Sequence, residues 1–245
     1  MRRRFFVDHF EGNTAVMEGD AAHHLANVLR AQTGQLYELS DGSTAWLARI
    51  DSVARQRIEF SLLEQLPASQ PGADITLLLA VVKFDAFEWA LEKATELGVS
   101  KIIPLAAARS EKGLLAAAAK RSQRWQKILV ESGQQSRRLR LPQLDDLAKP
   151  AKGFAAQTAG FRLMLSERSD APSIRQSLDR SNARAKSVAP TAALAIGPEG
   201  GWTDEELTAA RAANFQEASL GQFILRTETA VISALSILNF ALASD

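Results

Sequence analysis

The stretch ITLLLAVVKFDAFEWALEKATELGVSKIIPL, residues 75–105, decides the fold class. Its first part, Ile75–Val82, is a continuous apolar run of the kind that forms a strand buried on both faces. Over residues 85–98 the apolar side chains recur at helical spacing, and Gly98 is placed to end the helix. The segment KIIPL, residues 101–105, then predicts a second strand. The order strand, helix, strand predicts a parallel sheet with helices packed on it.

The same alternation continues to the carboxyl end of the chain. The patterns predict, in order, a helix over 121–133, strands at 161–166 and 191–197, a helix from Thr203, a short strand at 217–220 and a last helix from about Glu228. The last helix is apolar around most of its circumference, so it is either fully buried or part of a subunit interface. Residues 73–245 are therefore predicted to form one α/β domain.

The first seventy residues have a different texture. Alternating patterns predict short strands around one helix, with a turn at Asp41-Gly42, and the strands are expected at 3–7, 35–40, 44–50 and 57–66. The segment LPASQPGAD, residues 66–74, has two prolines, a glycine and no apolar periodicity, which predicts a linker. The chain is therefore expected to have a small β-rich domain over 1–72 before the α/β domain.

Composition excludes several classes of chemistry. The 245 residues include no cysteine, which excludes disulfides, thiolate metal sites and covalent catalysis by a thiol. The three histidines have no acidic spacing pattern around them, so no metal site is expected. The apolar run near the start is too short for a secretory signal, and Thr229–Ala243 is too short to span a membrane. We therefore expect a soluble, unexported protein of the cytoplasm.

The charge is unevenly distributed along the chain. The net charge is only +1, but residues 101–186 carry 18 basic and 7 acidic side chains. Such a basic middle is typical of a face that binds a polyanion. A solvated helix surface would give the same pattern, and charge alone does not separate the two.

A glycine loop follows one of the predicted strands. In IGPEGGWTDEE, residues 196–206, Thr203 can cap the next helix, and Glu206 completes a capping box. The glycines lie at the carboxyl end of a parallel strand, where open α/β sheets bind ligands, and they let a ligand approach the main chain. The alternative is a tight turn that needs a positive φ angle. The loop is not a P-loop, because no Lys-Ser or Lys-Thr follows it.

A second loop of this kind is LGQFILRTETA, residues 220–230. Its apolar residues Phe223, Ile224 and Leu225 would be unusual in a solvated loop. They indicate a buried wall, which would serve either a ligand or the packing of the core.

Several motifs together carry a resemblance to a known family. These are the two loops just quoted, EKATELGVSKIIPL at 92–105, RW at 124–125, ESGQQSRR at 131–138 and HHLANVLR at 23–30. In this order they resemble the ribosomal RNA small subunit methyltransferase E family, of the SPOUT superfamily of knotted methyltransferases. The resemblance runs from one end of the chain to the other.

The resemblance implies an amino-terminal PUA-like β-barrel domain that helps to bind RNA, and a carboxyl-terminal α/β domain of the SPOUT type with a deep trefoil knot. It implies methylation of N3 of a uridine in 16S ribosomal RNA of the small subunit, with S-adenosyl-L-methionine as cofactor, by a homodimer without a metal. The implied cofactor residues are Leu165, Ser166, Glu167, Ile196, Gly197, Pro198, Gly200, Gly201, Leu220, Gly221, Gln222, Ile224 and Leu225. One departure is Gln222-Phe223, where many relatives have Pro-Arg.

The reaction needs a base or a cation, because N3 of uridine carries a proton at neutral pH and must lose it to attack. Arg226 is the candidate cation, and Glu228 or Glu199 is the candidate base. Glu228 has an equally strong alternative as a carboxylate at a helix amino terminus. Glu199 has the alternative of bonding nearby backbone amides.

The basic residues then acquire an expected role on the RNA phosphates. The predicted RNA contacts are Arg2, Arg3, Arg4, His23, Arg30, Arg109, Lys112, Arg137 and Arg138, supported by Lys120, Arg121, Arg124 and Arg140. His23, Asn27 and Arg30 fall on one face of a helix, whereas His24 and Trp125 are expected to be packed. A competing function is a non-catalytic RNA-binding protein that retains the fold.

Overall fold

The structure is a computed structural model that describes residues 3–67, 72–180 and 190–242. The chain forms two compact units, one of residues 1–70 with 131–141 and one of residues 71–130 with 142–245. A single boundary between residues 72 and 73 was predicted, and the prediction missed that residues 131–141 belong to the first unit. Part of the predicted linker and Arg2 lie outside the described residues.

The first unit is built on one sheet of six strands in the order β1-β4-β5-β6-β3-β2. β1 and β4 are parallel and the other neighbours are antiparallel. β1 and β2 are the edge strands in this order. In a closed barrel the first and last strands would also pair with each other, and no such pairing is found among the described residues. The strands are β1 (Arg4–Phe6), β2 (Phe10–Glu11), β3 (Thr14–Glu18), β4 (Leu36–Ser40), β5 (Ala45–Ala54) and β6 (Arg57–Gln65). β2 and β3 were not predicted, because β2 has only two residues and the five residues of β3 are polar at both ends.

The helix of the first unit differs from the regular α-helix that the sequence predicted. α1 (Gly19–His23) continues into η1 (His24–Val28), a π-helical turn with a wider spacing. Arg30 lies beyond both, with a left-handed φ of 52°. The prediction that His23, Asn27 and Arg30 share one face at α-helical spacing is therefore wrong for Arg30. His24 is half-buried, as expected of a packed residue.

The segment 131–141 is held to the first unit by hydrogen bonds from three side chains. Arg4 donates to the carbonyl of Arg137 at 2.8 Å, and Ser40 Oγ donates to the carbonyl of Leu139 at 2.8 Å. Arg140 donates to the carbonyl of Gly42 in the turn between β4 and β5. These bonds join residues about a hundred positions apart, so no local pattern could reveal them.

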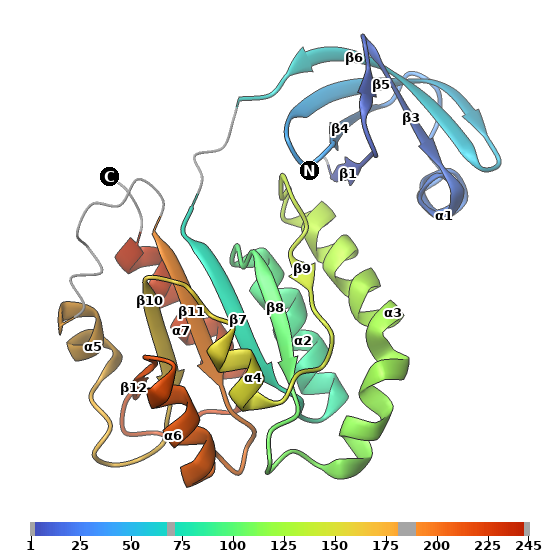
Figure 1. The fold of residues 1–245 in the computed structure, drawn as a ribbon. Helices are drawn as coiled ribbons and strands as arrows, with labels where there is room; N and C mark the ends of the chain where they lie inside the picture. The colour runs from blue at the N-terminus through green and yellow to red at the C-terminus, as the bar shows by residue number, and fades with distance from the viewer. Residues whose placement is uncertain (1–2, 68–71, 181–189, 243–245) are drawn as a thin grey trace. The chain divides into compact units, whose positions relative to one another are not determined.

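The second unit is an α/β fold with a parallel sheet (Figure 1). The strand order is β12-β10-β11-β7-β8-β9, and every neighbouring pair is parallel. The strands are β7 (Asp74–Ala80), β8 (Lys101–Leu105), β9 (Gln143–Leu144), β10 (Phe161–Leu165), β11 (Thr191–Ile196) and β12 (Gln216–Ala218). The predicted fold class is thus confirmed at the level of an α/β domain with a parallel sheet.

Helices cover both faces of this sheet. The helices are α2 (Phe84–Glu96), α3 (Lys112–Gln135), α4 (Pro150–Ala155), α5 (Ile174–Arg180), α6 (Asp204–Ala212) and α7 (Thr227–Leu242). On β7, Leu77 and Leu79 pack toward α2 and α7, whereas Leu78 and Ala80 pack toward α4 and α6. Successive side chains of a strand point to opposite faces, so an uninterrupted apolar run serves both layers. The short elements α4, α5 and β9 were not predicted.

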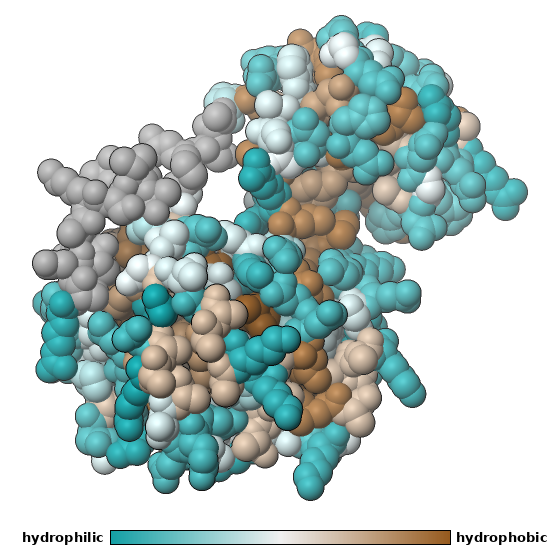
Figure 2. Space-filling model, viewed as in Figure 1, coloured by the Kyte–Doolittle hydropathy of each residue, from teal (hydrophilic) through white to brown (hydrophobic). Residues whose placement is uncertain are grey.

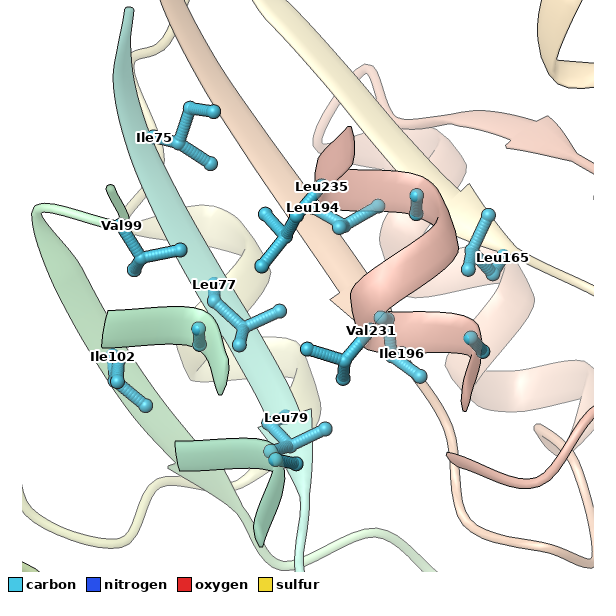
Figure 3. Packing of buried hydrophobic residues seen from close by; sticks show 14 of the residues in the cluster. Ile75, Leu77, Leu79, Val99, Ile102, Leu165, Leu194, Ile196, Val231 and Leu235 are labelled. Carbon is cyan, nitrogen blue, oxygen red and sulfur yellow. The ribbon is translucent and has the colours of Figure 1, made fainter. Parts of the chain in front are cut away.

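The last helix is buried along one side. Val231 and Leu235 of α7 lie against the apolar side chains of β7 and β11 (Figure 3). Phe240, near the end of the same helix, is 81% exposed. The alternative of a fully buried helix is therefore wrong. On the face of this unit that Figure 2 shows, hydrophilic residues alternate with hydrophobic areas.

Trp125 belongs to the core, as the sequence predicted. It is buried on α3 and packs against Phe87, with ring centroids 4.6 Å apart. Nearby, Arg121 and Arg124 form ion pairs with the buried carboxylate of Glu88 at 3.1 and 2.7 Å. These two arginines therefore fasten α3 to α2, and they have less freedom to bind phosphates than the sequence suggested. Within the described ranges, no helix is both long and apolar enough to cross a membrane.

The contribution of the capping box of α6 to stability can be measured by substitution. The hydroxyl of Thr203 accepts from the amide of Glu206, and the carboxylate of Glu206 accepts from the amide of Thr203. Replacing Thr203 by alanine should lower the free energy of unfolding by about 1 kcal/mol, because the amide of Glu206 loses the hydroxyl that caps the helix. Urea unfolding measures this change. Thr208, exposed on the same helix, is the control, and Thr208→Ala should cost less than about 0.5 kcal/mol. Equal losses for the two variants would contradict the cap.

Candidate active site

A cavity of about 370 Å³ lies at the carboxyl ends of three neighbouring strands of the second unit. Its wall comes from the loops that follow β10, β11 and β12, over residues 165–168, 196–202 and 219–225. Parallel strands end at the same edge of a sheet, which brings loops that are far apart in sequence together there. Asp204 and Leu207 of α6, Thr227 and Ala230 at the start of α7, and Arg109 from the loop after β8 complete the wall.

Every residue predicted to bind the cofactor lines this cavity, as does one of the three predicted catalytic residues, Glu199. Arg226 and Glu228 do not line it. Arg226 is exposed just before α7, and Glu228 is buried in the first turn of α7. Between them, Thr227 lines the cavity, and its hydroxyl donates to the carbonyl of Gly197 at 3.4 Å.

Trp202 joins two of the loops, and the sequence analysis missed it. The ring is buried against Phe154, and its Nε1–H donates to the carbonyl of Leu165 at 2.9 Å. A Cβ atom at Gly197 would lie only 3.0 Å from this ring. The hydrogen bond joins the loops after β10 and β11, which are neighbours only in the folded chain, so the sequence could not predict it. The one signal in the sequence was a large aromatic residue directly after a glycine-rich loop.

Two glycines of the loop after β11 have a reason within the protein itself, which is a close aromatic ring at Gly197 and a left-handed backbone at Gly201. A Cβ atom at Gly200 would touch the side chain of Arg109 at 3.4 Å, and Gly201 has a left-handed φ of 70°. Gly197 makes room for Trp202. The absence of side chains at these positions is therefore not explained by the approach of a ligand alone. The alternative explanation, a turn with a positive φ angle, applies to Gly201.

Glu206 fastens this loop to a second one. One oxygen of its buried carboxylate accepts from the amide of Thr203 at 2.9 Å, as the capping box predicted. The other oxygen accepts from the amide of Ala108 at 2.8 Å. Residues 106–111, which follow β8, are thereby held against the beginning of α6.

The apolar residues of the loop after β12 are not the buried wall that the sequence predicted. Phe223 and Ile224 are 76% and 77% exposed, and Leu225 is half-buried. All three still line the cavity. They are therefore placed to contact a ligand from the open side, and the alternative of core packing is wrong for Phe223 and Ile224.

The charged groups around the cavity are of both signs. The acids that line it are Glu167, Glu199 and Asp204, and the cations are Arg109 and Arg168. Arg168 donates to Asp170 at 3.1 Å, and this bond raises the pKa of its guanidinium. Hydrogen bonds from its own amide and from Thr203, together with the charge of Arg109, lower the pKa of the neighbouring Glu205. The described residues contain no cluster of three potential metal ligands.

The predicted RNA-binding residues within the described ranges divide into four groups. Arg3, His23, Arg30, Lys112 and Arg137 are exposed. Arg138 is half-buried, and burial lowers the pKa of its guanidinium. Arg4 is 8% exposed and donates to Glu38 at 2.9 Å, so the prediction that it contacts RNA is wrong. Arg109 lines the cavity.

Comparison with known proteins relates this geometry to a family. Residues 69–239 match the family model described as RNA methyltransferase domain. The chain is 35% identical to Ribosomal RNA small subunit methyltransferase E of Synechocystis sp. over 229 residues, which are 91% of this chain and 71% of that protein. It is 28% identical to the protein of the same name from Aquifex aeolicus over 244 residues, 96% of this chain and 97% of that one.

Solved structures agree over the whole chain. Ribosomal RNA small subunit methyltransferase E from Neisseria gonorrhoeae, bound to S-adenosyl methionine, has a TM-score of 0.85 at 28% identity and covers 98% of each chain. A putative methyltransferase from Legionella pneumophila, in complex with the bound cofactor SAM, gives the same TM-score, identity and coverage.

Residues 69–239 carry both the parallel sheet and the whole wall of the cavity, so the second unit has the fold of an RNA methyltransferase domain and the cavity lies within it. The relatives extend this match from the second unit to nearly the full chain. The chain belongs to the ribosomal RNA small subunit methyltransferase E family.

Proposed function

We propose that this protein transfers the methyl group of S-adenosyl-L-methionine to N3 of a uridine in 16S ribosomal RNA of the small subunit. The observation that carries the proposal is the cavity at the ends of β10, β11 and β12, which is lined by every residue predicted to bind the cofactor. The Neisseria gonorrhoeae relative with the same fold is bound to S-adenosyl methionine. The choice of N3 rests on the family resemblance of the sequence motifs.

The residues of the cavity suit this cofactor. Its volume of about 370 Å³ is in the range of small-molecule sites. Leu165, Ile196 and Leu220 offer apolar surface for an adenine ring, and the lining acids favour a ligand that carries positive charge. When bound, the cofactor supplies an electrophilic methyl group on a sulfonium. The protein's contribution is to hold the loops in position and to exclude water, since transfer in line depends on orientation.

A proton must leave N3 before it attacks. Among the three predicted catalytic residues, Glu199 lines the cavity, and we assign it the role of the base. The predicted roles of Arg226 and Glu228 stay predictions. Glu199→Gln should lower the methyl transfer rate with little change in cofactor affinity, and an unchanged rate would remove Glu199 from this role.

The finer features of the fold are also proposed. We propose that the first unit is PUA-like and binds RNA, which its exposed basic residues support. A trefoil knot in the second unit is supported by β11, which lies between β7 and β10 although both precede it along the chain. A crystal structure whose backbone can be traced without a threaded loop would contradict the knot.

We further propose a cytoplasmic homodimer. Trp89 on α2 is 44% exposed and Phe240 on α7 is 81% exposed, and these two helices pack together. Exposed apolar residues on adjacent helices indicate a surface for another protein, and a second copy of the chain suits the family resemblance. Sedimentation at micromolar concentration tests this proposal, and a monomer throughout would overturn it.

One experiment tests the function as a whole. The protein is titrated with S-adenosylmethionine in a calorimeter, and the same preparation is given radiolabelled cofactor with small ribosomal subunits that lack the modification. Cofactor binding and label on uridine N3 are expected. Binding without transfer would indicate a non-catalytic RNA-binding protein or another RNA substrate. No binding would overturn the assignment of the cavity.

A further inference from the structure

The two arginines of the cavity differ in their surroundings. Arg168 contacts Asp170 and also lies 3.7 Å from Glu217 and 3.9 Å from Asp204, so its charge is largely offset. Arg109 forms no ion pair within 4 Å in the described part of the chain. Its Nη1 donates instead to the neutral carbonyl of Gly200 at 2.6 Å. Of the two arginines in the cavity wall, Arg109 is therefore the one whose positive charge is less offset by nearby carboxylates.

Arg109 is also held in place. Its aliphatic part lies along Gly200, where a Cβ atom would already be in contact with its Cβ and Cδ atoms at 3.4 Å. The preceding residue, Ala108, is fixed by its hydrogen bond to the buried Glu206. A guanidinium has five N–H donors, and the bond to Gly200 takes one of them. The remaining donors belong to an exposed side chain that lines the cavity.

Sequence reasoning gave the role of the cation to Arg226. That residue is exposed and does not line the cavity, whereas Arg109 does. A fixed cation needs little reorganisation when charge develops beside it, and this is the arrangement that stabilises anions in enzymes.

We propose that Arg109 presents its charge to an anionic oxygen of the reactants bound in the cavity, with Gly200 and Glu206 as the groups that position it. The inference rests on the proposed function. The anionic oxygen belongs to the deprotonated uracil ring, to the carboxylate of the cofactor or to an RNA phosphate. The chemistry is the same for the three, since a guanidinium donates charge-assisted hydrogen bonds to each.

The test compares three substitutions of Arg109 in the full-length protein. Arg109→Lys keeps the charge, Arg109→Gln keeps a donor for the Gly200 carbonyl without the charge, and Arg109→Ala removes both. Lys152→Ala, at an exposed position on α4, is the control for loss of one positive charge. Far-UV circular dichroism and thermal unfolding verify that each variant is folded. For Arg109→Gln and Arg109→Ala we expect the transfer rate, the cofactor affinity or the RNA affinity to fall at least tenfold. Arg109→Lys should lose less in the same measurement.

Three readouts identify the source of the anion. If the oxygen is that of the uracil ring, the single-turnover transfer rate of the variant falls at neutral pH. The rate recovers as the pH rises, because uracil N3 then loses its proton without help from the protein. If it is the cofactor carboxylate, cofactor affinity falls, and decarboxylated cofactor binds equally to wild type and Arg109→Ala. If it is a phosphate, RNA affinity falls and the salt dependence of binding decreases by about one counterion.

Two results would overturn the proposal. Arg109→Gln could match wild type while Arg109→Ala is impaired, and Arg109 would then only hold the glycine loop. All three readouts could also be unchanged in Arg109→Ala. A failure of the proposed function is distinct, because the wild-type protein would then neither bind the cofactor nor transfer the methyl group.

Discussion

Replacing Gly197 by valine is expected to lower the affinity for S-adenosylmethionine at least tenfold, or by about 1.4 kcal/mol. The Cβ atom alone would lie 3.0 Å from Trp202, and the two methyl groups of valine need more room. The indole ring cannot yield easily, because it is buried against Phe154 and bonded to the carbonyl of Leu165. The loops after β10 and β11 would therefore move apart, and both contribute to the cavity wall.

The same substitution should cost about 1–3 kcal/mol of stability, which is typical of overpacking. Calorimetric titration measures the affinity, and thermal unfolding measures the stability. Gly113→Val is the matched control on α3, where the nearest atom to an added Cβ is the Glu111 carboxylate at 3.9 Å. Cofactor affinity for Gly197→Val equal to that of the control would show that the bond between Trp202 and Leu165 does not hold the site together.

Replacing Glu38 by alanine is expected to destabilise the first unit by about 3–5 kcal/mol. Glu38 and Arg4 form an ion pair at 2.9 Å in which each side chain is only 10% exposed. Removal of the carboxylate leaves a buried guanidinium that still donates to the carbonyl of Arg137 but has lost its negative partner. The loss would therefore release β1, β4 and the segment 131–141 together.

Denaturant unfolding measures this effect, and hydrogen exchange of the β1 and β4 amides localises it. Glu59→Ala is the control in the same sheet, since its pair with Arg57 is about half exposed and should be worth at most about 1 kcal/mol. The double variant Arg4→Met with Glu38→Leu should recover much of the stability, because no charge is then left buried. A loss below 1 kcal/mol for Glu38→Ala would restore Arg4 as a candidate for RNA binding.

The strands that precede the loops of the cavity could be located from local patterns in the sequence. An apolar run, a glycine or a turn, and a marked helix start recur at residues 191–206 and 216–228. In a parallel sheet such loops meet at one edge, whatever the order of the strands. The family resemblance named residues from three such segments, and in the structure these residues line one cavity.

The roles of individual charged residues could not be found in the same way. Arg4, Arg109 and Arg121 have the same side chain in basic stretches of the sequence. In the structure Arg4 is in a buried ion pair, Arg109 lies on a glycine loop, and Arg121 binds a carboxylate of α2. Each partner is more than thirty positions away. Charge counting therefore overestimated the number of arginines available to RNA.

By itself the sequence determined the α/β class, the capping box of α6 and the family, because each depends on motifs that are short and local along the chain. Only the tertiary structure decided that 131–141 packs with the first unit, that Trp202 joins two loops, and that Arg109 enters the cavity. These contacts depend on the order of strands in the sheet and on the packing that this order permits. Periodicity along a chain carries no record of strand order, so those contacts could not be predicted from it.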